Sequence, residues 1–183
     1  MRCIVTSPCK IGRADKSRAV PPATWGVAID VPLPLSGEPA AECRSSDGNH
    51  TMVITFDNNV VSGNATVTSG VGTVSGNPIF SANTMTVNLT SIADVQRITV
   101  TLHAVTDTSS PPQTLADTAV SVNMLTGDTN GNKTVNASDI AQTKTQVGAT
   151  VTSANFLEDV NVSGGISASD VAIVKSRVGN SVP

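Results

Sequence analysis

One pattern of oxygen-bearing residues occurs twice in the last third of the chain and constrains its fold more than any other feature. The first copy runs from Asp128 to Asp139 and the second from Asp159 to Asp170. In each copy Asp, Asn, Ser or Thr residues recur at alternate positions, and an Asp closes the segment. A loop that curls around one centre points its first, third and fifth residues inward. The repeat therefore predicts two equivalent loops, each built around its own centre.

The oxygen-bearing positions match those of the ligands in a calcium-binding loop of the EF-hand type. Calcium prefers oxygen ligands in a flexible shell, whereas zinc would require the Cys and His residues that both segments lack. Such a loop uses the side chains at positions 1, 3, 5, 9 and 12 and the main-chain carbonyl at position 7. The predicted calcium ligands are Asp128, Asn130, Asn132, Thr134, Asn136 and Asp139 in the first loop, and Asp159, Asn161, Ser163, Gly165, Ser167 and Asp170 in the second.

A short helix is predicted to follow each loop and to begin inside it. Residues 139–148 align with residues 170–179, and the glycine that closes each segment is a natural helix stop. No helix is predicted to enter either loop, because residues 125–127 and 150–156 are expected to be extended. The repeating unit is therefore a loop followed by a helix, without the first helix of a full EF-hand.

This pair of loop-helix segments, with Asp at position 12 and no entering helix, resembles a type I dockerin. Dockerins are the calcium-dependent docking modules of bacterial polysaccharide-degrading systems, and the resemblance covers residues 126–183. It implies a cohesin partner, which such modules contact through positions 10 and 11 of each loop and through basic residues of the following helix. The partner-binding residues implied here are Ala137, Ser138 and Lys144 in the first repeat, and Ala168, Ser169, Lys175 and Arg177 in the second.

The two loops differ at position 6, where the first has Lys133 and the second has Gly164. A lysine at a turn that favours positive φ adds strain and places a cation near the ion, so we expect the second loop to bind Ca²⁺ more strongly. Each loop contributes only two carboxylates, which predicts modest affinity because ligand charge tunes calcium binding. The alternative is that both loops are Asn, Asp and Ser turns that bind no ion.

The middle of the chain has the alternation of apolar and polar residues that is typical of half-buried strands. Turn residues separate short alternating segments, and no helical period is present. This pattern predicts an antiparallel β-sandwich of immunoglobulin-like size over residues 25–125, followed by a small helical calcium module over residues 126–183. The predicted strands are residues 27–31, 52–56, 65–68, 85–89, 98–102 and 119–124.

This middle region also resembles a small β-sandwich that often precedes dockerin-like tails in predicted surface proteins of environmental bacteria. Residues 31–37, 42–45 and 125–128 carry the likeness. It implies no chemistry, and the role that it suggests is a spacer or stabilising domain.

Composition excludes several partners for the chain. The formal net charge is −3 and the Lys and Arg residues are scattered, so no basic patch predicts nucleic acid. No apolar run reaches the length of a membrane-spanning helix, and we expect a monomer. The first residues lack the apolar stretch of a secretory signal peptide. We therefore expect residues 1–24 to be poorly ordered or non-native, and the chain to be a fragment of a longer protein.

An enzyme is the main competing interpretation. His50 and His103 could act as bases beside Cys43 or a serine, but no nucleophile motif accompanies them. Cys43 is expected to be a small buried thiol, and His103 to lie on the polar face of its strand. A carbohydrate-binding surface needs exposed aromatic rings, and Trp25 is the aromatic residue of this region not expected in the core.

These observations favour a non-catalytic calcium-binding module of a secreted or cell-surface bacterial protein, with the question of enzyme activity left open. One alternative is a small hydrolase or glycan-active fragment that uses the surface of the sandwich. The other is a surface or adhesion module whose calcium sites are purely structural.

Overall fold

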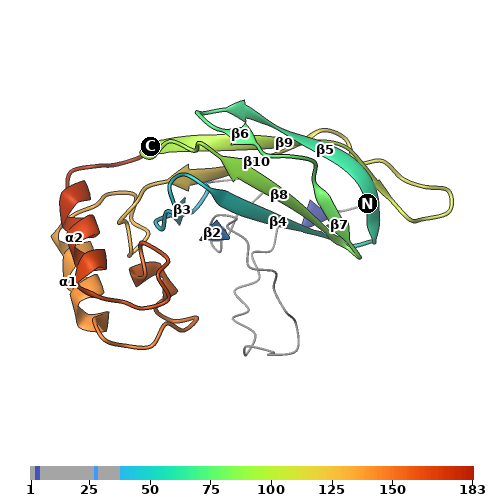
Figure 1. The fold of residues 1–183 in the computed structure, drawn as a ribbon. Helices are drawn as coiled ribbons and strands as arrows, with labels where there is room; N and C mark the ends of the chain where they lie inside the picture. The colour runs from blue at the N-terminus through green and yellow to red at the C-terminus, as the bar shows by residue number, and fades with distance from the viewer. Residues whose placement is uncertain (1–2, 5–26, 29–37) are drawn as a thin grey trace.

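The computed structural model describes residues 3–4, 27–28 and 38–183, which form two β-sheets followed by two short helices (Figure 1). The first sheet has the strand order β1-β4-β8-β6, with β2 also paired to β4 and β7 to β8. The second has the order β3-β10-β9-β5. The elements are β1 (Cys3–Ile4), β2 (Val27–Ala28), β3 (Ala41–Glu42), β4 (His50–Phe56), β5 (Val60–Ser69), β6 (Thr73–Val74), β7 (Ile79–Ser81), β8 (Thr84–Thr90), β9 (Gln96–Asp107), β10 (Thr118–Met124), α1 (Ala137–Gln146), the 3₁₀ helix η1 (Phe156–Glu158) and α2 (Ala168–Arg177).

Alternate residues of the long strands face a single core shared by the two sheets. Met52, Ile54 and Phe56 of β4 are at most 1% exposed, and Met52 lies opposite Val87 of β8 in the antiparallel register. Apolar residues of β5, β9 and β10 in the second sheet belong to the same cluster. Burial of apolar side chains is the main driving force for folding. Because this core holds few aromatic rings, aliphatic and Met side chains supply most of the buried surface.

The strand predictions are confirmed for β4, β8, β9 and β10, whose pairs β4–β8 and β9–β10 are antiparallel as predicted. The sheets also contain two parallel pairs, which were not predicted. β2 pairs with β4 and β3 pairs with β10 in parallel. Strands joined by tight hairpins must be antiparallel, whereas partners separated by long connections are free of that constraint. Four short strands among the described residues, β1, β3, β6 and β7, were not predicted because two or three residues cannot display alternation.

β5 is longer than its predicted core at residues 65–68. Its pairing with β9 shifts register between Val60 and Ser62 and again between Ser62 and Asn64. Gly63 lies between these points with φ +151°, and a Cβ built there would lie 2.9 Å from Val105 Cγ2. The bulged backbone interrupts the period of two, which hides this half of the strand from sequence analysis.

Of residues 1–24, the structure describes Cys3–Ile4, which form β1, and the expectation of little fold in this segment stays a prediction. Cys3–Ile4 pairs with Phe56 and Thr55 of β4. The rest of that segment, Trp25 and residues 29–31 of the predicted first strand lie outside the described residues. No helix of the described part of the chain is long and apolar enough to cross a membrane.

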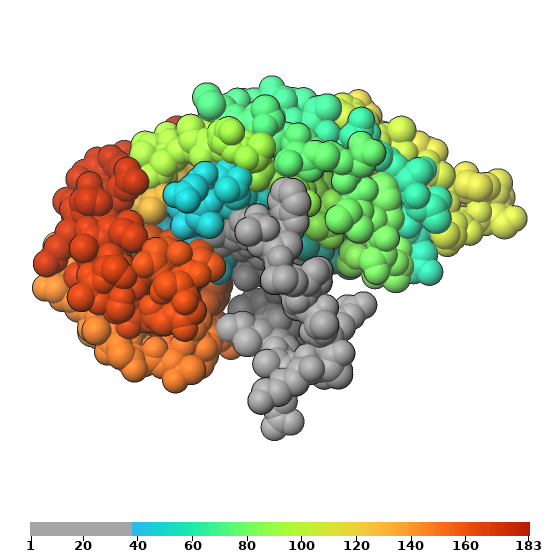
Figure 2. Space-filling view, viewed as in Figure 1, coloured from blue at the N-terminus to red at the C-terminus, as the bar shows by residue number. Residues whose placement is uncertain are grey.

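The helical part packs against one end of the two sheets (Figure 1). The space-filling view shows the chain near residues 40–50, in cyan, lying against the orange and red helical part (Figure 2). Gly127 N donates to Cys43 O at 2.9 Å, and Ser45 N donates to Val160 O at 2.9 Å. Ala41 is buried in the same cluster as Val135 and Val174. β3 therefore contributes Ala41 to the core of the helical part, and the segment after β3 is hydrogen-bonded to that part.

Candidate metal centre and docking surface

The aspartate at position 1 of each loop holds the turn of that loop. Asp128 accepts hydrogen bonds from Asn132 N at 3.0 Å and from Lys133 N at 2.9 Å, one to each carboxylate oxygen. Asp159 accepts from Ser163 N and Gly164 N, both at 2.9 Å, in the same arrangement. The two loops thus adopt one backbone geometry, as the repeated sequence predicts.

The residues at positions 9 and 12 begin the helices. Asn136 is the N-cap of α1, and Asp139 accepts from Asn136 N at 2.9 Å to complete a capping box. Ser167 and Asp170 form the same box at the start of α2. Two of the predicted ligands in each loop therefore also fix where the following helix starts.

Positions 3, 5 and 7 complete the turn between them. Asn130 Oδ1 accepts from Asn132 N at 3.0 Å, and Asn132 Oδ1 accepts from Thr134 N at 2.9 Å. In the second loop Asn161 Oδ1 accepts from Ser163 N at 3.0 Å, while Ser163 Oγ donates to Gly165 O at 3.1 Å. All twelve predicted ligand residues lie within the two compact loops, and the oxygens at positions 1, 3 and 12 are held by main-chain N–H groups.

Two positions of each loop, 4 and 6, have left-handed backbone. Lys133 has φ +69°, as its place in the loop predicts, and Gly131 two residues earlier has φ +71°. In the second loop Gly164 has φ +85°, but Val162 has φ +55°. Each loop thus combines one glycine with one strained residue, and a β-branched residue in this region is the more unusual case. The sequence gives no signal that Val162 adopts this backbone conformation.

The ammonium group of Lys133 has its own partners. Its Nζ lies 2.6 Å from Glu38 Oε2 and donates to Pro183 O at 3.1 Å. Lys133 and the nearby Arg97 together lower the pKa of Glu38. The strained residue of the first loop, Lys133, has a counterpart in Val162 of the second, and Glu38 pairs with the Lys133 cation. The relative strength of the two sites stays a prediction.

The four aspartates at positions 1 and 12 are buried, with Asp139 and Asp170 fully inaccessible. Burial, together with repulsion from Asp139, raises the pKa of Asp128 despite the hydrogen bonds from Lys133 N and Asn132 N. None of the ion pairs within the described residues includes any of these four carboxylates. A pair of buried carboxylates without a cationic side chain is costly, and a calcium ion between them would remove that cost.

The donor set matches calcium and no softer metal. No group of three or more His, Cys, Asp or Glu residues that could hold a metal occurs in the described part of the chain. Each loop instead combines two carboxylates with amide, hydroxyl and main-chain oxygens. These neutral oxygens are ligands that a hard cation such as calcium accepts. The residues present therefore fit calcium.

Each loop is joined to the chain that follows the helix of the other repeat. Gly179 N donates to Val135 O at 2.9 Å, and Gly148 N donates to Ile166 O at 2.9 Å. Both glycines have positive φ just after a helix, which confirms that they end α1 and α2. Val135 and Ile166 are themselves buried. The two repeats therefore form one unit, in which each repeat makes the equivalent contact with the other.

Residues 150–156, before the second loop, are predicted to be extended, and this prediction is wrong for part of the segment. Asn155 Oδ1 accepts from Thr152 N at 2.6 Å, which closes a turn before η1. The buried Glu158 at the end of η1 accepts from Gln142 Nε2 at 2.7 Å. Asn side chains commonly accept main-chain hydrogen bonds in turns, as Asn155 does here. Its presence in the sequence was therefore a signal for this turn.

The residues implied in partner binding are all exposed. Positions 10 and 11 of both loops occupy the first turns of α1 and α2, and the lysines lie in the second halves of the helices. Arg177 differs from the others because its Nε lies 3.9 Å from Asp94 Oδ2 of the β-sheet part. The exposed set is Ala137, Ser138, Lys144, Ala168, Ser169, Lys175 and Arg177.

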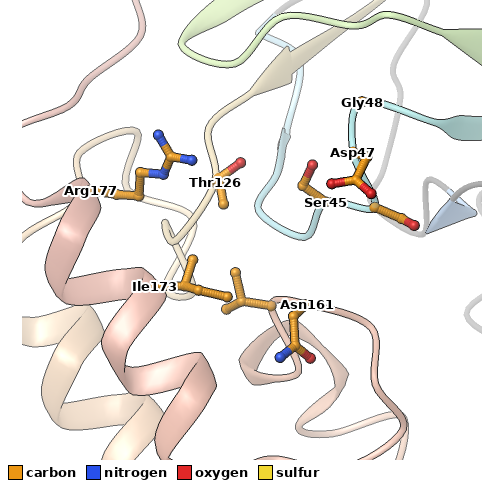
Figure 3. A pocket seen from close by; sticks show the side chains of 9 residues that line it. Ser45, Asp47, Gly48, Thr126, Asn161, Ile173 and Arg177 are labelled. Atoms are coloured by element: carbon orange, nitrogen blue, oxygen red, sulfur yellow. The ribbon is translucent and has the colours of Figure 1, made fainter.

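Arg177 also lines a cleft of about 460 Å³ at the junction of the two parts (Figure 3). Ser45, Asp47 and Gly48 line the cleft from the segment before β4. Asn161, at position 3 of the second loop, lines it from the opposite part. The cleft separates the β-sheet part from the second loop without enclosing a recognisable set of catalytic groups.

Two residues raised by the enzyme interpretation are poorly suited to catalysis. Burial raises the pKa of the Cys43 thiol well above its usual range, and Sγ donates to Leu157 O at 3.4 Å. His50 is 2% exposed, and burial followed by the nearby Arg44 charge lowers its pKa to about 4. The expectation of a small buried thiol at Cys43 is confirmed.

His103 lies on the outer face of the second sheet, as predicted, and joins two polar groups. Nε2 lies 2.9 Å from Thr66 Oγ1, and Nδ1 lies 2.9 Å from Asp117 Oδ2. Sequence analysis did not bring these three residues together, because they come from separate segments. The side chains of His103 and Asp117 are 33% and 67% exposed, which is typical of cross-strand surface contacts.

Comparison with known protein families supports the identity of the helical part. Residues 126–179 match the family model of the dockerin type I domain. The match supports a type I dockerin at this end of the chain, and both loops and both helices lie within it. No curated protein and no solved structure matches the chain.

Proposed function

We propose that this chain is a non-catalytic module of a secreted or cell-surface bacterial protein, whose dockerin part docks to a cohesin-type domain when calcium is bound. The matched pair of loops carries the proposal. Each loop buries two aspartates beside neutral oxygens, and both lie in the segment that matches the dockerin family. Such modules serve polysaccharide-degrading or surface assemblies, and we extend that setting to this chain.

Calcium has a defined place in this function. Bound in each loop, it would supply positive charge that offsets the aspartates at positions 1 and 12. Asp139 and Asp170 already accept the N-cap N–H groups of α1 and α2. The ion would therefore stabilise the same carboxylates that start the helices. Because a partner contacts the helix starts, docking should depend on calcium.

The docking surface is formed by the exposed first turns of the two helices. Ala137 and Ser138 begin α1, and Ala168 and Ser169 begin α2 in the equivalent places. Lys144 and Lys175 add one exposed cation to each repeat. Small side chains beside a positive charge suit a partner surface that approaches closely and carries acidic groups.

The β-sheet part serves as a carrier for the docking module. We propose that it is an immunoglobulin-like β-sandwich over residues 25–125 and that the chain is monomeric. The shared cluster of Ala41, Val135 and Val174 supports a fixed attachment between the two parts. A fixed attachment would hold the docking helices in one orientation relative to the rest of the parent protein.

The test is binding of the full chain to a panel of purified cohesin domains by biolayer interferometry, in calcium and in excess chelator. We expect binding in calcium that is lost in chelator. The double variant Asp128→Ala/Asp159→Ala should lose binding too, because both position 1 carboxylates are gone. Asp117→Ala, which removes an exposed carboxylate of the β-sheet part, is the matched control and should bind normally.

Two other outcomes separate the alternatives. A chain that binds calcium but no cohesin domain would favour a surface or adhesion module with structural calcium sites. Hydrolysis of an ester or glycoside substrate that is lost in His103→Ala would favour the hydrolase alternative, since His103 is the exposed histidine with a hydroxyl and a carboxylate beside it.

A further inference from the structure

A serine at position 11 of each loop connects two predicted calcium ligands that are not adjacent in sequence. In the first loop Asn130 Nδ2 donates to Ser138 Oγ at 2.7 Å, and Ser138 Oγ donates to Asn136 Oδ1 at 2.8 Å. The serine therefore bridges position 3 to position 9 across the mouth of the loop.

The second loop repeats this bridge. Asn161 Nδ2 donates to Ser169 Oγ at 3.0 Å, and Ser169 Oγ lies 2.7 Å from Ser167 Oγ. Position 9 is an asparagine in the first loop and a serine in the second, so the bridge persists although one of its members differs. Because both loops contain the bridge although position 9 differs between them, we infer that the serine at position 11 has a specific structural role.

That role follows from the chemistry of the asparagine at position 3. An amide group has one oxygen, which can bind a cation, and one NH₂ group, which cannot. In both loops the NH₂ group is taken by the serine, while Oδ1 faces the loop and accepts from the position 5 N–H at 3.0 Å. Reversing the amide would break both contacts and present N–H groups to the ion.

We propose that Ser138 and Ser169 are positioning residues for calcium, which hold the position 3 amides with their oxygens toward the ion. The inference rests on the calcium sites of the proposed function and adds a role for two residues that the docking surface also contains. The serines themselves act through Asn130 and Asn161. Residues that orient a ligand in this way commonly change metal affinity by about tenfold or more when they are replaced.

The first test compares calcium affinity of the full chain and of Ser138→Ala/Ser169→Ala by isothermal titration calorimetry. We expect the dissociation constant to rise about tenfold in the double variant. Ser138→Thr/Ser169→Thr keeps both hydroxyls and should restore the affinity. Ser176→Ala removes an exposed serine of α2 whose hydroxyl donates to Ile173 O and takes no part in the bridge, so it should leave the calcium affinity unchanged.

The second test asks whether the serines act through amide orientation. In the background Asn130→Asp/Asn161→Asp both ends of the position 3 group are oxygen, so no orientation has to be chosen. Removing the serines in that background should change calcium affinity by less than about twofold, against about tenfold in the asparagine background. An equal loss in both backgrounds would overturn the inference, because it would indicate a general effect on the loop.

The outcomes also separate this inference from the proposed function. Unaltered calcium affinity in Ser138→Ala/Ser169→Ala would overturn the positioning role and leave calcium-dependent docking intact. Failure of the unmodified chain to bind calcium would overturn both. Far-ultraviolet circular dichroism of each variant in excess chelator checks that α1 and α2 remain formed.

Discussion

At the scale of single residues, the two loops need positive φ at the same two positions but place glycine at different ones. Position 4 is Gly131 in the first loop and Val162 in the second, while position 6 is Lys133 and then Gly164. All four residues have positive φ. The strain at Lys133 could be predicted from the sequence because position 6 of such a loop normally has a glycine at a sharp turn. The strain at Val162 could not be found that way, because only the folded loop shows that position 4 is left-handed as well.

Val162→Gly should stabilise the chain by about 1 kcal/mol, since glycine adopts left-handed backbone without the steric cost of a β-branched side chain. Val162 is 42% exposed, so little packing is lost. Urea unfolding in excess chelator measures the change. Lys133→Gly serves as the comparison and should gain less, because it also removes the contact with Glu38. A smaller gain from Val162→Gly than from Lys133→Gly would contradict the strain argument.

His50 gives the β-sheet part a pH dependence. Its pKa is about 4 in the folded chain, lowered from 6.5 by burial and by Arg44, with Asp94 opposing. The stability that this neutral histidine provides is present above about pH 6.5 and is lost as pH falls toward 4. The total is on the order of 3 kcal/mol.

Urea unfolding at several pH values between 7 and 4, in excess chelator, tests this for the chain and for His50→Gln. We expect the variant to be less stable near pH 7 but to lose less stability on acidification, because it has no proton to gain at this position. Parallel losses in the two proteins would show that His50 does not cause the acid sensitivity.

At the scale of elements, regular patterns were predictable and short or irregular ones were not. The alternation in β4 and β8 and the repeat that forms α1 and α2 all appear where the sequence predicts them. The two-residue strand β3 and the single turn of η1 were not predictable, since each depends on contacts with distant residues. For the candidate site, sequence indicated every loop residue, but the bridge through Ser138 and Ser169 required the folded geometry.

The caps of the helices should work without calcium. Ser167→Ala should destabilise the chain by about 1 kcal/mol even in excess chelator, because the N-cap hydroxyl satisfies main-chain donors of α2. Ser176→Ala in the last turn of the same helix is the control and should have a much smaller effect. Urea unfolding gives both values. An effect of Ser167→Ala seen only with calcium would mean that the residue acts as a ligand and not as a cap.

At the scale of the whole molecule, the β-sheet part and the dockerin part share a buried boundary. Arg44 pairs with Glu42 and lies 4.7 Å from the centre of the Phe156 ring, so a charged pair of the β-sheet part is covered by the segment before the second loop. Glu38 also joins Lys133 of the first loop to Arg97 of β9. The separate domains expected from sequence thus contact each other through specific groups, which composition and periodicity do not reveal.

Both loops are proposed to be calcium sites. Isothermal titration of the full chain with calcium, after removal of bound metal, measures the number of ions per chain directly. We predict two ions per chain, and one per chain after either Asp128→Ala or Asp159→Ala. A titration that shows no calcium binding, or binding that survives both substitutions together, would contradict it.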